Sequence, residues 1–285
     1  MSIDIDQIDG LRAILDDLNS QISGIVATMP AGLIFGLGTA NDATNPTTHI
    51  TIAPGQCKSW DLTTDIVLAA GMTKRLDAVW AAGTGNGGRD SATALALNQS
   101  WHVHLIKNPN TNVVDVLFSQ SVNNPTLPAG FTKFRRIFSL PRLGTATTPG
   151  SGTDIPSYLQ TGNITRLIKP YGDYTAQTGV TTPQLKAIMV PLGIKVEAEL
   201  CAQLSGNGTL CYLRITDPDL TTAAASRLAG GVWGQIRIAG NETYLTWLGY
   251  ENCNNVGQVY VTCTDNTGTW ALTTRGWRDT FREQL

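Results

Sequence analysis

Two histidines spaced two residues apart are the residues of this chain best suited to metal chemistry. His102 and His104 lie in the stretch WHVHLIK, whose alternation predicts a β-strand, so both imidazoles are expected on one face of that strand. If that face met the axis of a trimer, six imidazoles could ligate a transition metal. The alternative is a pair of ordinary hairpin side chains. Because the sequence does not place this strand on an axis, we predict no metal centre and no other cofactor.

The other candidate constellations do not indicate a reaction. The glycine-rich stretch GTGNGGRD at 83–90 resembles a phosphate-binding loop in composition, but it lacks the lysine and serine that such loops use, and we interpret it as a surface turn. No serine lies in a G-x-S-x-G elbow. The available carboxylates do not form a recognisable pair for sugar cleavage: Asp61, Asp65, Asp77, Asp90 and Asp115. We therefore predict that the protein is not an enzyme and has no catalytic residues.

The five cysteines do not indicate a zinc site or a complete disulfide framework, because their number is odd and none are spaced as CxxC. Cys201 and Cys211 flank the turn-like SGNG and could face each other across a hairpin. A disulfide at that position is the alternative to buried free thiols, which is the interpretation we favour.

Aromatic residues are concentrated in the second half of the chain. Exposed rings that stack on sugar rings would suit a receptor-binding tip. Tryptophans in β-rich domains are more often core or subunit-interface residues, and we favour that interpretation. No individual residue is therefore assigned as a receptor contact among Trp233, Tyr244, Trp247, Tyr250, Tyr260, Trp270 and Trp277.

Short apolar or alternating runs, bounded by turn sequences, predict that the chain after Pro30 is mainly β. The runs are HITIAPG, DIVLAAG, SWHVHLIK, NVVDVLFSQ and KFRRIFSL in the first half, and LKAIMVPLGIKVEAELCAQL, GTLCYLRITD, VWGQIRIAG, TYLTWLGY, GQVYVTCTD and TWALTTRGWRD in the second. The clearest unit is a hairpin in which Trp101, Val103 and Leu105 share a face and residues 108–112 form the turn. Closely spaced strands of this kind predict an antiparallel β-sandwich or jelly-roll-like architecture.

The first thirty residues carry an unbroken heptad pattern. Its apolar positions are Ile8, Leu11, Leu15, Leu18, Ile22, Ile25 and Met29. A 3.5-residue period is typical of a coiled coil, and the β-branched Ile22 and Ile25 favour three strands over two. We predict a short trimeric coiled-coil helix for oligomerisation and attachment, which ends at Pro30. The alternative is a helix packed on the protein's own β-structure.

The distribution of these signals divides the chain into four segments. Residues 1–30 are the predicted trimerisation and attachment helix, and residues 31–143 are a β-rich domain. Residues 144–154, GTATTPGSGTD, form a linker or long surface loop before a second β-rich domain at 155–285. It stays open whether the two β-rich halves are separate or share one sandwich.

Charge and hydropathy argue against two kinds of partner. Only 15% of the residues are charged and the net charge is −2, with no clustered basic stripe, so no nucleic-acid partner is expected. Arg135 and Arg136 are the densest basic spot; as neighbours on a strand they should point to opposite faces, with one of them in an ion pair. No apolar run reaches the roughly 18 residues of a membrane span, and the acidic start is unlike a signal peptide, so neither membrane insertion nor secretion is expected.

Five short motifs follow one another between residues 73 and 140. They are KRLDAVWAAGTGNGG, WHVHLIK, VVDVLFS, PTLPAGFT and RRIFSL. This order resembles a segment that recurs in tail-fibre and related virion proteins of tailed bacteriophages, and the ending ALTTRGWRDTFRE is similar to the T-GW-D-R ending of those proteins. The family usually has GGLD where this chain has GGRD, with Arg89 in place of the leucine.

The resemblance implies a structural protein of a virion that is assembled in the host cytoplasm. We expect a homotrimeric tail fibre or short appendage, whose β-rich head is a candidate for binding the host receptor. Its expected partners are further copies of itself, other virion proteins of the tail, baseplate, neck or head, and a host-surface glycan or protein. Two alternatives stay open: a head-attached fibre or decoration protein, and a glycan-degrading tailspike enzyme.

Overall fold

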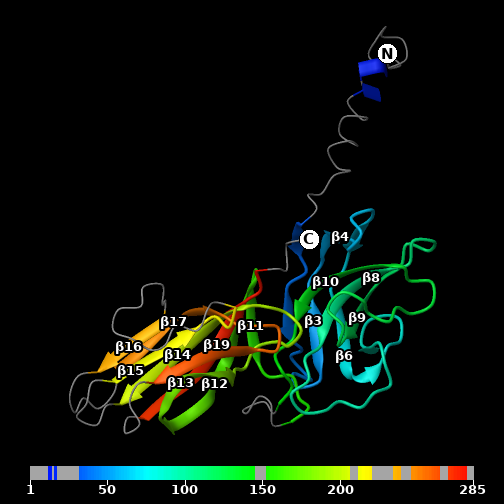
Figure 1. Cartoon of the computed structure of the whole chain (residues 1–285). Helices are drawn as coiled ribbons and strands as arrows, with labels where there is room; N and C mark the ends of the chain where they lie inside the picture. The colour runs from blue at the N-terminus through cyan, green and yellow to red at the C-terminus, as the bar shows by residue number, and fades with distance from the viewer. Residues whose placement is uncertain are drawn as a thin grey trace.

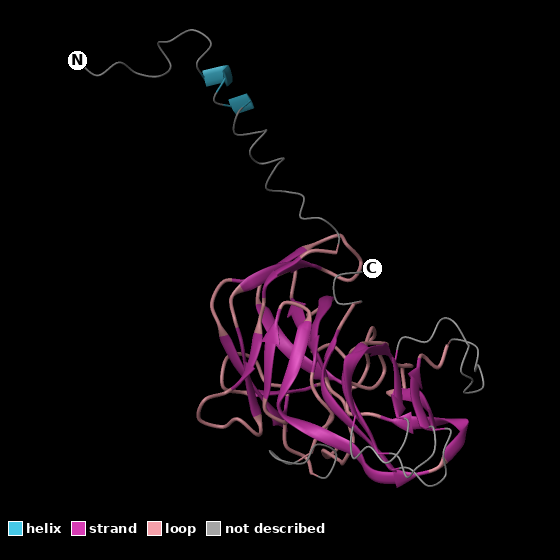
Figure 2. Cartoon of the chain, turned by 90° about the vertical axis from the view of Figure 1, so that its left-hand side faces the viewer, coloured by secondary structure: helices cyan, strands magenta, loops and turns pink. Residues whose placement is uncertain are grey.

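The computed structural model describes residues 12–14, 16–17, 32–144, 152–205, 211–219, 234–238, 245–263 and 269–280 (Figure 1). As predicted, this part of the chain is mainly β. Two groups of sheets lie side by side, one formed by β1 to β10 and the other by β11 to β19 (Figures 1 and 2).

The described residues of the N-terminal segment are helical and stand apart from the sheets. Residues 12–14 and 16–17 are α-helical and all are exposed to solvent, including Ile14, whose exposed fraction is 62%. Both views place them at a distance from the β-structure (Figures 1 and 2). The heptad positions, from Ile8 to Met29, lie outside the described residues, so the coiled coil and the trimer stay predictions.

The first group contains two sheets that enclose one hydrophobic core. The smaller sheet has the order β1 (Ile34–Gly36), β4 (Gly55–Lys58), β5 (Asp65–Leu68). The larger has the order β10 (Lys133–Ser139), β8 (His102–Lys107), β9 (Val114–Ser119), β7 (Gly87–Arg89), β6 (Met72–Val79), β3 (His49–Ile52), β2 (Thr39–Asn41). Side chains of both sheets, such as Ile66 and Leu105, are fully buried in the shared core.

The second group also contains two sheets around a core. One has the order β11 (Tyr158–Thr161), β12 (Ile164–Thr178), β19 (Thr269–Arg278), β14 (Glu197–Ser205), β17 (Leu245–Asn252). The other has the order β13 (Val180–Ala187), β18 (Gln258–Cys263), β15 (Cys211–Thr216), β16 (Gly234–Ile238). Leu200 and Val261, one from each sheet, are buried in their common core.

The predicted hairpin is confirmed. Strands β8 and β9 pair antiparallel from His102 opposite Ser119 to Lys107 opposite Val114. The turn between them is closed by a hydrogen bond from the backbone N–H of Asn108 to the carbonyl of Val113, at 2.9 Å. Trp101, Val103 and Leu105 enter the same core, as the alternation predicted.

Strand β7 shows that two predictions were wrong. Residues 83–86 form a turn, but Gly87–Arg89 is a buried strand in the middle of the sheet rather than part of a surface turn. It runs parallel to both of its neighbours, β6 and β9, so the sheet is not purely antiparallel. A Cβ on Gly87 would lie 1.9 Å from the carbonyl oxygen of Val79, and one on Gly88 would lie 2.6 Å from the Phe118 ring. The glycines are therefore required by close packing inside a sheet.

The proposed hairpin around the SGNG stretch is also absent. Cys201 lies on β14 in the five-stranded sheet, whereas Cys211 begins β15 in the four-stranded sheet. Cys201 pairs instead with Leu248 and Thr273, and Cys201 and Cys253 are free thiols.

Polar contacts join the two groups of sheets. Arg136 of β10 donates to Asp279, which follows β19, at 2.5 Å and 3.3 Å, and both side chains are only 7% exposed. This confirms that one of the adjacent arginines forms an ion pair. Arg142 donates through Nε to the carbonyl of Val190 at 3.1 Å. Where the chain passes between the groups, Gly144 and Asp154 bond each other in both directions, at 2.9 Å and 2.7 Å.

Candidate functional site

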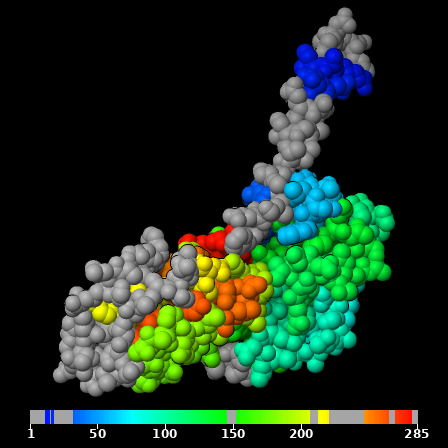
Figure 3. Space-filling view, in the orientation of Figure 1, coloured from blue at the N-terminus to red at the C-terminus, as the bar shows by residue number. Residues whose placement is uncertain are grey.

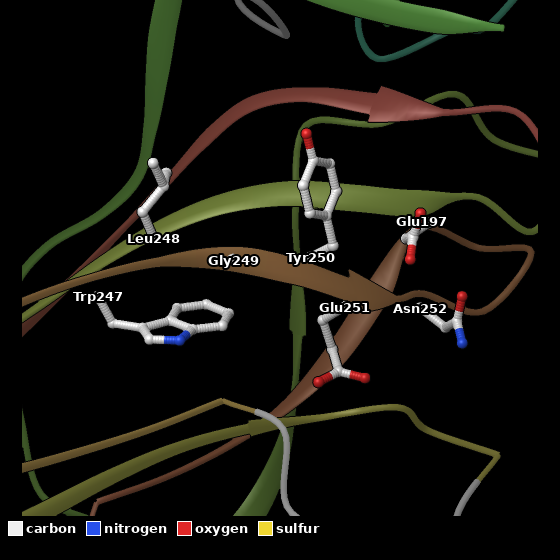
Figure 4. Close-up of a pocket in the computed structure, with 7 residues that line it drawn as sticks. All are labelled: Glu197, Trp247, Leu248, Gly249, Tyr250, Glu251 and Asn252. Atoms are coloured by element: carbon white, nitrogen blue, oxygen red, sulfur yellow. The ribbon is translucent and has the colours of Figure 1, made fainter.

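A hollow of about 540 Å³ lies beside β17, at the edge of the five-stranded sheet (Figure 4). Among the described strands, β17 pairs only with β14. Six consecutive residues of β17, Trp247 to Asn252, line the hollow together with Glu197 of β14. An edge strand presents backbone groups that no neighbouring strand satisfies, so the hollow combines side chains with a polar backbone rim.

Successive side chains of β17 point to opposite sides of the strand, so its two sides carry different residues. Leu248 and Tyr250 project to one side of the strand, and Trp247 and Glu251 to the other (Figure 4). The Trp247 ring covers Gly249 so closely that a Cβ there would lie 2.1 Å from the ring. Trp247 also packs against the hydrophobic core, which leaves its ring half-buried. The aromatic surface of the hollow is thus fixed by packing.

The charged groups of the hollow are held in place by neighbours. Arg278 donates to Oε2 of Glu197 at 2.5 Å, and its guanidinium carbon lies 5.0 Å from the centre of the Tyr250 ring. Cation–π contact and ion pairing together fix this arginine over the sheet. Glu251 is only 6% exposed, and burial raises its pKa to about 7, with the negative charges of Asp217 and Glu197 acting in the same direction.

These groups suit a neutral, hydroxyl-rich ligand. The carboxyl groups of Glu197 and Glu251 and the amide of Asn252 offer hydrogen-bond acceptors and donors on the same hollow as two aromatic rings. Aromatic faces bind the apolar faces of sugars, while carboxyl and amide groups orient their hydroxyls. Arg278 covers part of Tyr250, and the half-buried ring of Trp247 is the second aromatic contact of the hollow.

The two histidines considered as metal ligands lie on β8, inside the first group of sheets. His102 and His104 are almost completely buried. Nδ1 of His102 lies 2.8 Å from Oγ of Ser139, and Nε2 of His104 lies 3.0 Å from the carbonyl oxygen of Ser121. Burial lowers the pKa of His104 to about 3 and holds that of His102 well below its usual value, so both are neutral at pH 7. Within the described residues, no three His, Cys, Asp or Glu side chains are grouped to hold a metal ion.

The aromatic residues singled out in the sequence divide between core and surface. Trp270 and Trp277 are 1% exposed and belong to the core. Trp247 and Tyr250 line the hollow, and Tyr260 on β18 is partly exposed. Trp233 and Tyr244 lie outside the described residues. The sequence pattern located this region but did not separate its buried rings from its accessible ones.

The sequence did not reveal the buried ion pair inside the seven-stranded sheet. Nζ of Lys74 lies 2.9 Å from Oδ1 of Asp115, and their side chains are 0% and 1% exposed. Lys74 also donates to the carbonyls of Ala81 and Gly83 at 2.7 Å and 3.1 Å. The other oxygen of Asp115 accepts from the N–H of Gly83 at 2.8 Å. The pair therefore joins β6, β9 and the turn at 83–86. The one signal in the sequence was an aspartate within the apolar run VVDVLFS.

The remaining carboxylates considered for sugar cleavage also have structural partners. Asp61 is paired with Lys133, Asp65 with Lys58 at 2.7 Å, and Asp77 with Arg75 at 3.0 Å. Oδ2 of Asp90 accepts from the N–H of Thr126 at 3.1 Å. None of these residues lines the hollow beside β17.

No helix in the described part of the chain has the length and apolarity needed to cross a membrane. A comparison of the chain with protein-family models finds no match, and a search among curated proteins finds no significant relative.

Proposed function

We propose that this protein is a structural component of a tailed-bacteriophage virion, a homotrimeric tail fibre or short appendage that attaches through its N-terminal helix. The observation that carries this proposal is the position of the helical residues. Residues 12–14 and 16–17 are exposed and stand apart from the sheets (Figures 1 and 2). A helix packed on the protein's own β-structure would be covered by it, whereas a heptad stem needs other helices.

The order of the phage-like motifs supports the same proposal. In the fold, KRLDAV lies on β6, HVHLIK on β8, VDVLFS on β9 and RRIFS on β10, all in one sheet. The buried pair of Lys74 and Asp115 connects two of these motifs. The resemblance therefore falls on one sheet, and its shared residues include a buried ion pair inside that sheet.

The proposal is tested by the mass of the intact protein and by its place on a particle. Native mass spectrometry of the full chain should give a homotrimer; a monomer or dimer would contradict the stem. Antibodies against the head, imaged on virions of the source phage, should label the tail or an appendage. Labelling of the capsid would favour the head-attached alternative, and failure to label virions would contradict the virion role.

A second candidate function, recognition of a host-surface saccharide, is favoured by the hollow beside β17. Host polysaccharide would be titrated into the protein by calorimetry, and Asn252→Ala and Glu197→Gln should weaken binding. Asn110→Ala, at the exposed turn between β8 and β9, is the matched control. Release of reducing ends from the same polysaccharide would instead support the tailspike-enzyme alternative, with Glu251 as the carboxyl group to replace first.

A further inference from the structure

The three-stranded sheet presents an apolar outer face at the end of the head nearest to the helical residues. Strand pairing places Phe35, Gln56 and Val67 in one row across β1, β4 and β5. Phe35 is 66% exposed and Val67 49%, and Leu33, two residues before Phe35, is 43% exposed. In Figure 3 the light-blue segment that contains β4 and β5 forms the end of the head that faces the helical residues. We call these four residues the stem-proximal face.

The opposite side of the same three strands is buried, so the exposure is confined to the outer face of the sheet. Ile34, Cys57 and Ile66 lie opposite one another in register and are buried in the core of the first group of sheets. Because successive residues of a strand point to opposite faces, Phe35 and Val67 must point outward when these three point inward. Together with Leu33 they give this face apolar surface that a second copy can cover.

The length of chain before the sheet limits what can cover this face. Leu33 follows Met29, the last heptad position, by four residues, which span at most about 14 Å when fully extended. If the heptads of several copies meet in a stem, Leu33 of each copy lies within this distance of the stem, and Phe35 within about 21 Å of it. The same faces of the other copies are then brought to the same place.

We propose that the stem-proximal face packs against a second copy of the chain, around the base of the stem. This inference rests on the proposed homotrimer and adds a second contact to it. The face is small compared with the roughly 800 Å² per partner of a stable interface. It therefore adds to the affinity supplied by the heptads and fixes how the heads are turned relative to one another.

Photo-cross-linking of the full-length protein tests the contact directly. A benzophenone amino acid at position 35 should join copies, and mixing isotope-labelled with unlabelled protein identifies links between copies. The cross-linked peptides should contain residues 33–35, 56 or 67 of another copy. The same probe at Ile168, which is 64% exposed on the five-stranded sheet, is the control and should not join copies at the same yield.

The outcomes separate the contact from the trimer itself. A trimeric native mass with no link between copies from position 35 would overturn the contact and leave the proposed stem intact. A monomeric mass without links would overturn both. A dimer linked through position 35 would support the contact and contradict the trimer.

Dissociation on dilution supplies a second measurement. The double variant Phe35→Ser/Val67→Thr should raise the concentration at which the assembly half-dissociates by at least about tenfold, because apolar surface buried between copies is lost. Leu159→Ser/Ile168→Thr removes equally exposed apolar side chains elsewhere and should leave that concentration unchanged. Equal effects of the two double variants would overturn the proposal.

Discussion

Nζ of Lys74 and Oδ1 of Asp115 lie 2.9 Å apart in the interior of the seven-stranded sheet, where neither side chain is more than 1% exposed. Burial lowers the pKa of Lys74, and the hydrogen bond and charge of Asp115 oppose that effect. With carbonyl partners at residues 81 and 83, the hydrogen-bonding capacity of the ammonium group is satisfied although its side chain is 0% exposed. The pair thus holds a strand, a turn and a second strand at one point.

Breaking this pair should strongly destabilise the first group of sheets. Lys74→Met leaves the Asp115 carboxylate buried without its cation, and the free energy of unfolding should fall by about 3–5 kcal/mol in denaturant titrations. Arg75→Met, on the same strand, removes a partly exposed pair with Asp77 and should change it by less than about 1 kcal/mol. Similar losses from the two variants would contradict the role assigned to Lys74.

The two glycines of the buried strand β7, Gly87 and Gly88, should not accept larger side chains. Gly88→Ala places a methyl group 2.6 Å from the ring of Phe118, and we expect a loss of about 1–3 kcal/mol or more from overpacking. Gly38→Ala is the control, because a Cβ there meets no atom within 4 Å. Thermal unfolding of the two variants distinguishes them, and a melting temperature of Gly88→Ala equal to that of the control would show that the sheet can relax.

Two buried carboxyl groups should make stability depend on pH in the neutral range. Burial raises the pKa of Asp173 to about 7, although its Oδ2 accepts a hydrogen bond from Thr274 at 2.6 Å, and Glu251 has a pKa of about 7 for the same main reason. The folded state then holds protons that the unfolded state has released above pH 4. The contribution of these two carboxyl groups to stability should therefore fall as pH rises from about 4 to about 7 and level off above that range, whereas the buried neutral His102 and His104 act in the opposite direction below about pH 6.5.

Substitution of these two carboxyl groups separates their effect on the pH dependence of stability from the effect of the other titrating residues. In Asp173→Asn/Glu251→Gln, the unfolding free energy between pH 4 and 7 should change with a more positive slope than in the parent protein, because neither side chain titrates. Denaturant titrations at several pH values measure the slope. An unchanged slope would mean that the two groups are ionised in the folded protein.

The ion pair between Arg136 and Asp279 should hold the two groups of sheets together. Asp279→Asn removes one charge from a pair that is 7% exposed on each side, and a loss of about 3–5 kcal/mol is expected for an uncompensated buried charge. Hydrogen exchange should quicken in β10 and in the last residues of β19. Faster exchange spread evenly over both cores would indicate general destabilisation instead of loosening at this contact.

Local sequence patterns were sufficient to predict most of the strands. The alternation in HVHLIK and VDVLFS, with the polar NPNTN between them, specified a hairpin because each arm buries one face and the turn residues are close in sequence. The candidate strands of the second half also form, from β15 to β19. Such features depend on neighbours within a few residues.

Features that depend on distant residues could not be predicted in this way. GTGNGGRD has turn composition, and its insertion as β7 between β6 and β9 depends on strands that begin many residues to either side. The ion pair of Arg136 was anticipated, but its partner lies 143 positions later. The hollow beside β17 likewise combines residues of β17 with Glu197 on a strand some fifty residues earlier.

The reciprocal bonds between Gly144 and Asp154 have a practical consequence for labelling the protein. Gly144 and Asp154 are hydrogen-bonded to each other, so they stay close together whatever the length of the segment between them. Extending a loop between fixed ends costs little, about 0.6 kcal/mol for each doubling of its length. An epitope or a fluorescent peptide inserted between these two residues would therefore mark the protein at the junction of its two groups of sheets, away from the proposed stem and the hollow beside β17.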